Sequence, residues 1–253
     1  ERVLVITGGD VHVGDGRVLR RADIVIRGDK IEEVGRDLRL PEDAEIIDAS
    51  GKIVSPGLVL PRASGFGAPR SFGLEEIEDA INPFDPTIKL GLAVGITAFG
   101  MISEEGRDTP KGKSAVLKLS PGDLEGFVCA KNTFVGMSVP LDPKQWKSLR
   151  DLVEKAKEHR EKLAELKGKK DAKPPTPPRG AAPLLRVRDG EAVLWVRSRG
   201  GPFDSDAGRQ AVALADLLGC GIVLDRPTTA WTMADEIART GSMVALLPRQ
   251  QVP

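Results

Sequence analysis

The sequence is poor in residues that many binding sites need. Aromatic residues make up 4% of the 253 residues and tyrosine is absent, which argues against a surface that stacks bases or sugars. Lysine plus arginine and aspartate plus glutamate number 37 each, so there is no excess of positive charge to attract a polyanion. We therefore expect no nucleic acid among the partners of this chain.

Histidine, cysteine and long apolar runs are also scarce. His12 and His159 are the two histidines, and we interpret both as ordinary surface or partly packed side chains. Cys129 and Cys220 are interpreted as buried free thiols rather than a disulfide. No apolar run approaches the length of a membrane span, which predicts a soluble protein. The chain begins at Glu1, which leaves both the cytoplasm and export after N-terminal processing open.

Residues 1–57 contain short apolar runs separated by tight turns. Val3–Ile6 is followed by the turn signal Gly8-Gly9-Asp10, and Ala22–Arg27 alternates like a strand with one buried face. The pattern predicts a small antiparallel sheet or β-sandwich module. Ser55-Pro56-Gly57 then breaks the strand pattern and marks the end of this module.

Residues 58–253 alternate strands with helices. A helix over about Pro86–Val94, capped by Asp85, precedes strands at Ile96–Ile102 and Ala115–Leu119, and residues 120–143 are expected to be irregular. In the last part we expect strands at Val193–Val196, Ile222–Leu224 and Met243–Leu247. The helices between them are expected at Asp206–Leu218 and Ala230–Thr240. Short links between such elements require parallel strands. The fold class is therefore α/β, a partial TIM-like (β/α) barrel after the N-terminal module.

A charged helix and a lysine- and proline-rich segment occupy about residues 144–183. Residues 144–167 carry a partial apolar stripe at helical spacing, whereas the following segment "KGKKDAKPPTPPRGAAP" is too charged and too rich in proline to pack. We expect this segment to be a solvated surface excursion, in preference to a tail that binds nucleic acid or an acidic partner.

Several stretches together resemble the amidohydrolase superfamily, and most closely its imidazolonepropionase-like group. The strings "ADIVIRGDKIEEVG" and "AEIIDASGKIVSPGLV" resemble the opening sandwich and the entry into the first barrel strand. The string "AVGITAFGMI" resembles a family strand with the pattern aGVTt, and residues 112–119 and 211–248 resemble segments that follow it. The resemblance implies a composite fold, a β-sandwich module followed by a (β/α) barrel.

The resemblance also shows where the family's metal ligands would lie. In the family, PGLVD precedes a His-x-His pair that helps to hold one or two divalent metals such as zinc or iron, which activate water and polarise the scissile carbonyl. Aligning this motif places Leu60 at the aspartate and Arg62 and Ser64 at the two histidines. A guanidinium group stays protonated and cannot ligate a cation, and a neutral serine hydroxyl is a poor ligand. We therefore expect no metal or other cofactor.

Asp225 is the remaining candidate for the site. It ends a predicted barrel strand, and catalytic groups of this fold gather at the carboxyl ends of the strands. The string "LDRP" is equally compatible with a capping or turn carboxylate. Arg62, Ser64 and Asp225 are thus candidates for a degenerate pocket, without an assigned catalytic residue.

By the resemblance, the strands up to Pro253 form only part of an eight-stranded barrel. An incomplete barrel leaves an apolar strand edge unpaired, which favours association. Either the chain is a fragment of a longer protein, or another chain covers the edge in a homo- or hetero-oligomer; we expect such a partner.

Three functions remain open. The first is a non-catalytic subunit that acts in the assembly of a larger complex. The second is a metal-dependent hydrolase of C–N bonds, such as cyclic amides, completed by residues or a partner beyond this chain. The third is a small-molecule binder in which Arg62 attracts an anion at the barrel mouth.

Overall fold

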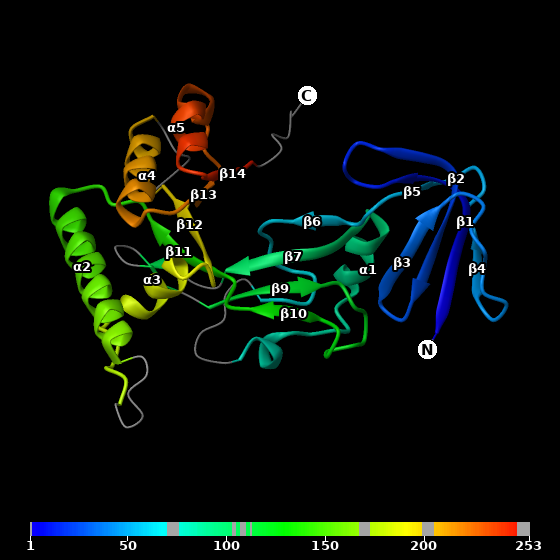
Figure 1. The fold of residues 1–253 in the computed structure, drawn as a ribbon, viewed down its shortest axis with the longest axis horizontal. Helices are drawn as coiled ribbons and strands as arrows, with labels where there is room; N and C mark the ends of the chain where they lie inside the picture. Colours follow the sequence, from blue (N-terminus) through cyan, green and yellow to red (C-terminus); the bar gives the residue numbers. More distant parts are fainter. Residues whose placement is uncertain are drawn as a thin grey trace. The chain divides into compact units, whose positions relative to one another are not determined.

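The computed structural model describes residues 2–69, 76–102, 105–106, 110–111, 113–166, 173–198 and 205–246. The chain divides into two compact units, Glu1–Leu58 and Val59–Pro253, which are described separately (Figure 1). In these described ranges, no helix has both the length and the apolar character needed to cross a membrane.

Unit 1 is a five-stranded sheet. Its strands are β1 (Val3–His12), β2 (Val18–Arg27), β3 (Lys30–Gly35), β4 (Glu45–Asp48) and β5 (Ile53–Val54). The order is β3-β2-β1-β4, and β5 also pairs with β1. The first three strands are antiparallel as expected, but β4 and β5 run parallel to β1. The chain between β3 and β4 is longer than a hairpin turn and reaches the other side of β1, which explains the difference from the expected antiparallel sheet.

Both faces of this sheet carry small apolar clusters. Val3, Val5 and Val25 form one cluster, and Val11, Ala22 and Ile24 form the core of the other. Successive side chains of a strand point to opposite faces, so a sheet with two apolar faces needs cover on both sides.

Unit 2 opens with a four-stranded sheet in the order β10-β9-β7-β6. It contains β6 (Leu58–Leu60), β7 (Ile96–Ile102), β9 (Ser114–Lys118) and β10 (Val128–Lys131), with the one-turn helix η1 (Ile77–Ala80) and α1 (Pro86–Ala93) before β7. Helix α1 begins where expected, because the Asp85 carboxylate accepts a hydrogen bond from the Thr87 amide at 2.8 Å. Strands β7, β9 and β10 are antiparallel, so the expected strand–helix alternation does not hold here. The link from β7 to β9 is too short for the helical crossover that parallel pairing requires.

The rest of unit 2 is a parallel five-stranded sheet in the order β14-β13-β12-β11-β8. Its strands are β8 (Glu105–Gly106), β11 (Phe134–Ser138), β12 (Val193–Arg197), β13 (Ile222–Asp225) and β14 (Met243–Ala245). The helices between them are α2 (Pro143–Leu166), α3 (Ala181–Arg188), α4 (Ser205–Leu218), the one-turn helix η2 (Ala230–Met233) and α5 (Ala234–Arg239). The parallel arrangement of the last three strands confirms the expectation from their short helical links.

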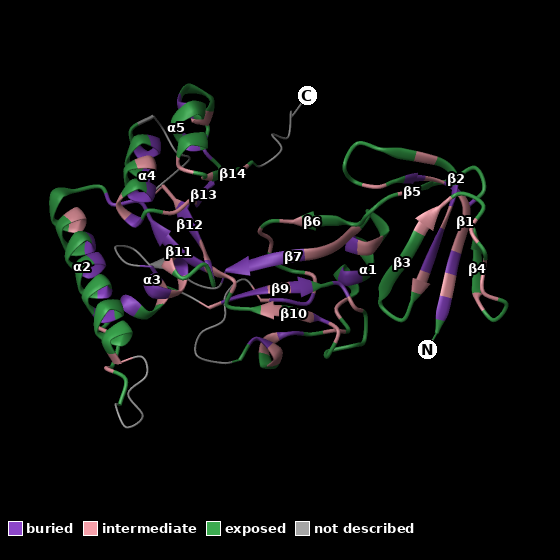
Figure 2. Ribbon diagram, viewed as in Figure 1, coloured by how far each residue is buried: buried purple, intermediate pink, exposed green. Residues whose placement is uncertain are grey.

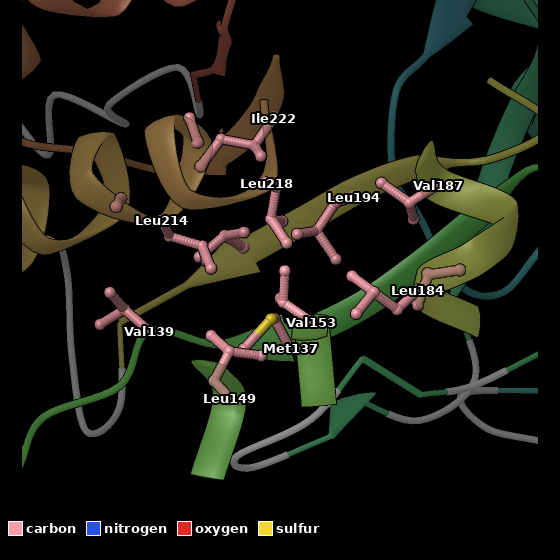
Figure 3. Close-up of a cluster of buried hydrophobic side chains, with 14 of the residues drawn as sticks. Met137, Val139, Leu149, Val153, Leu184, Val187, Leu194, Leu214, Leu218 and Ile222 are labelled. Atoms are coloured by element: carbon pink, nitrogen blue, oxygen red, sulfur yellow. The ribbon is translucent and has the colours of Figure 1, made fainter. Parts of the chain in front are cut away.

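The largest core of unit 2 lies between this parallel sheet and its helices. Met137, Leu149, Leu194, Leu214 and Ile222 come from β11, α2, β12, α4 and β13, and their side chains converge in one cluster (Figure 3). Figure 2 shows the outer surface of α2 exposed while its inner face is buried. The apolar stripe of this charged helix therefore packs into the core.

Three further elements differ from the sequence-based expectation. Strands β10 and β11 lie in the range 120–143 that was expected to be irregular, and α3 begins with a fully buried Ala181 in a segment that was not expected to pack. Strand β11 is short, carries Gly136 and follows Asn132, whose φ of +56° is typical of a turn. Its pairing with β12 outweighs these weak local signals.

Candidate functional site

The chain after β6 lies tightly against β7 and so fixes the position of Arg62. The Ala63 amide donates a hydrogen bond to the Gly100 carbonyl at 2.9 Å. A Cβ atom added to Gly100 would lie 2.3 Å from the Pro61 carbonyl oxygen, so only glycine permits this approach. Arg62 is therefore held at the end of β6 by main-chain contacts on both sides of it.

Asp225 is the last residue of β13 and is buried. Arg62 Nη1 donates to Asp225 Oδ2 at 2.9 Å, although 163 residues separate the two in sequence. The Asp225 side chain is 5% exposed and the Arg62 side chain 28% exposed. The structure thus joins two of the three candidate residues in an ion pair between the four-stranded sheet and the parallel sheet.

A second arginine contacts the same carboxylate. Arg226 Nη2 lies 3.4 Å from Asp225 Oδ2, and its side chain is 52% exposed. Its backbone has a φ of +56°, an uncommon value outside glycine, while its amide donates to the Ala245 carbonyl at 2.8 Å. Sequence reasoning did not assign Arg226, although its position next to Asp225 in "LDRP" was a usable signal.

The third candidate, Ser64, has no contact with the ion pair among the contacts described. It is exposed, two residues beyond Arg62. The contacts described for the Asp225 carboxylate come from Arg62 and Arg226.

An apolar layer lies beneath the cluster. Trp195 and Val223 are paired in register on β12 and β13, and alternation puts Asp225 on the same face as Val223. Ile102 and Phe134 complete this layer, and the Phe134 and Trp195 rings meet edge-to-face at a centroid distance of 6.0 Å. The buried indole Nε1–H of Trp195 has no hydrogen-bond partner in the part of the chain described here.

The residues at this position do not fit a divalent metal. Arg62 offers a protonated guanidinium where the family has an imidazole, and the Asp225 carboxylate is already bound by two guanidinium groups. The described residues contain no group of three or more His, Cys, Asp or Glu side chains that could hold a metal. His12 is exposed at the end of β1, and His159 is buried on α2.

Chemically, the cluster is a carboxylate paired with two guanidinium groups. Both arginines contact the same oxygen, Asp225 Oδ2, at 2.9 and 3.4 Å. The ion pair between Arg62 and Asp225 connects the ends of β6 and β13.

Comparison with known proteins identifies related folds. No protein-family model matches the sequence. The crystal structure of an amidohydrolase from Thermotoga maritima aligns with 98% of this chain and 72% of its own chain, with a TM-score of 0.72 and 20% identity. This likeness confirms the predicted α/β fold, an N-terminal β module followed by a partial barrel.

Curated sequences match over shorter stretches. A 5′-deoxyadenosine deaminase from Methanothrix thermoacetophila is 53% identical over 47 residues, which is 19% of this chain and 11% of that protein. A dihydroorotase from Lactobacillus johnsonii is 53% identical over 55 residues, or 22% of this chain and 12% of that protein. The match thus spans only about an eighth of the length of these curated relatives.

Proposed function

The chain has the fold of the amidohydrolase superfamily, and on this premise we propose that it is a non-catalytic, amidohydrolase-like subunit that acts in the assembly of a larger complex. The observation that carries the proposal is the 2.9 Å ion pair between Arg62 and Asp225. Arg62, which cannot ligate a metal, pairs with the carboxylate of Asp225 at the end of β13. In this proposal the ion pair connects the ends of β6 and β13 and stands where the family has metal ligands.

Metal analysis of the purified protein tests this proposal. After incubation with zinc, iron(II) and manganese and removal of loosely bound ions, we expect far less than one metal per chain by inductively coupled plasma mass spectrometry. Stoichiometric metal that resists dialysis would overturn the proposal, because the chain would then bind a metal through residues other than the family's histidine pair.

A working hydrolase of C–N bonds is the second candidate. It is favoured by the names of curated relatives, which include dihydroorotase and N-acyl-D-glutamate deacylase. Its remaining ligands would come from residues or a partner beyond this chain. Metal-dependent turnover of amides or lactams would support it, whereas no turnover and no effect of chelators would exclude it.

A further inference from the structure

A groove of about 600 Å³ lies between α2 and α4. Both helices connect paired strands of the parallel sheet, α2 between β11 and β12 and α4 between β12 and β13, so the groove is formed by internal elements of unit 2. On the α4 side it is lined by Gln210, Ala213 and Leu217, which carry no charge. The charges of the groove therefore come from the α2 side.

Three of the residues that line the α2 side follow one another at intervals of four. Asp142 immediately precedes the helix, Trp146 lies in its first turn, and Arg150 lies one turn further on. Residues four apart share one face of a helix and are separated by about 6 Å along its axis. An acidic and a basic side chain thus stand at equal distances on either side of a tryptophan.

Both charged side chains are exposed, and their contacts within the chain leave them able to pair with a partner. Asp142 Oδ1 accepts a hydrogen bond from the Gln145 amide at 2.9 Å, which caps α2. The Arg150 guanidinium lies over the Trp146 ring, 5.8 Å from its centroid, and Trp146 packs against the core of unit 2. Among the residues that the structure describes, neither Asp142 nor Arg150 has an ion-pair partner.

We propose that this groove binds a second copy of the chain, in a two-fold dimer whose axis passes beside Trp146 and sets α2 antiparallel to α2 of the partner. A two-fold interface brings the same patch against itself, so the residue four before the tryptophan meets the residue four after it. Asp142 of each copy then faces Arg150 of the other. Opposite charges at equal distances from the axis make this stripe complementary to its own copy, whereas equal charges would repel. The inference rests on the proposed assembly role and names its partner.

Charge reversal at either end of the stripe tests the proposal, with light scattering coupled to size-exclusion chromatography over a range of protein concentrations. We expect the wild-type protein to be a dimer. Arg150→Asp leaves each copy with two acidic ends, and Asp142→Arg leaves it with two basic ends, so each variant repels its own kind. We expect either substitution to raise the dimer dissociation constant about tenfold or more.

An equimolar mixture of the two variants is the decisive measurement. In the proposed arrangement the acidic ends of Arg150→Asp meet the basic ends of Asp142→Arg, so the mixture should form a heterodimer with an affinity close to that of the wild type. A misfolded chain would not regain affinity on mixing. Asp142→Arg also removes the cap of α2, which costs about 1 kcal/mol, and circular dichroism melting curves record that loss separately.

Lys155→Asp is the matched control, because Lys155 is exposed on α2 outside this groove and the substitution changes the net charge as Arg150→Asp does. It should leave the dimer intact. A monomeric wild-type protein would overturn the proposal, as would a dimer that is insensitive to both reversals or is not restored by mixing. A monomer without bound metal would remove the second-copy partner and leave the non-catalytic assignment standing, whereas bound metal would refute that assignment whatever the oligomeric state.

Discussion

Replacing Arg62 with methionine leaves the Asp225 carboxylate 5% exposed and without its nearest cation. Breaking a fully buried ion pair by removing one partner costs about 3–5 kcal/mol, whereas exposed pairs contribute about 0–1 kcal/mol. The Arg62 side chain is 28% exposed and Arg226 remains at 3.4 Å, so the cost falls between these limits. We expect Arg62→Met to lower the free energy of unfolding of unit 2 by about 2 kcal/mol.

Tryptophan fluorescence during urea unfolding measures this change. All three tryptophans, Trp146, Trp195 and Trp231, belong to unit 2, so the signal reports the unit that contains the ion pair. Circular dichroism records both units and shows whether they unfold separately, which decides whether a single two-state fit is justified.

Two comparisons make the result decisive. Arg209→Met removes an arginine from an exposed pair with Asp206, and we expect a change below about 0.5 kcal/mol. The double variant Arg62→Met/Asp225→Leu should be more stable than Arg62→Met alone, because no buried charge is left unpaired. If Arg62→Met behaves like Arg209→Met, the ion pair does not stabilise unit 2 and the reasoning fails.

Two further predictions concern other parts of unit 2. Trp195→Phe should leave the free energy of unfolding nearly unchanged or raise it. The lost apolar area is offset by removal of an indole N–H without a partner in the described part of the chain, which costs about 1–3 kcal/mol; a loss above about 1 kcal/mol in thermal or urea unfolding would contradict this. Arg239 donates to both carboxylate oxygens of Asp216, at 2.9 and 2.8 Å, and this lowers the pKa of Asp216. The pair therefore stabilises the native state above the unfolded pKa of about 3.9, and this contribution is lost as pH falls through the lower folded pKa. Asp216→Asn should remove this part of the pH dependence of the free energy of unfolding. An unchanged pH profile would contradict the prediction.

Strong periodic signals predicted most of the fold. The helix at Pro86–Ala93 and the strand at Ile96–Ile102 were expected within a residue of their observed bounds, because a cap and a continuous apolar run mark them locally. Strand β11 was not expected, since its pairing with β12 is a contact across the intervening α2 and α3. The pairing of β11 with β12 depends on tertiary packing, which outweighs the weak local pattern of β11.

The candidate site shows the same limit. Arg62 and Asp225 could each be selected from the resemblance and from strand ends, but their contact depends on how two sheets meet. Arg226 was missed although it adjoins Asp225 in the sequence, because neither its positive φ of +56° nor its contact with Asp225 is apparent from the residue type. The sequence shows the chemical type of each candidate residue, but it does not show how close these residues lie to one another.

The fit between Gly100 and Pro61 has an evolutionary consequence. Any side chain at position 100 would collide with the main chain that leads into Arg62. Related chains can therefore change position 100 only together with the backbone path at 61–62, and we expect these positions to covary. Glycine at position 100 leaves room for this main-chain path, whichever side chain follows the proline.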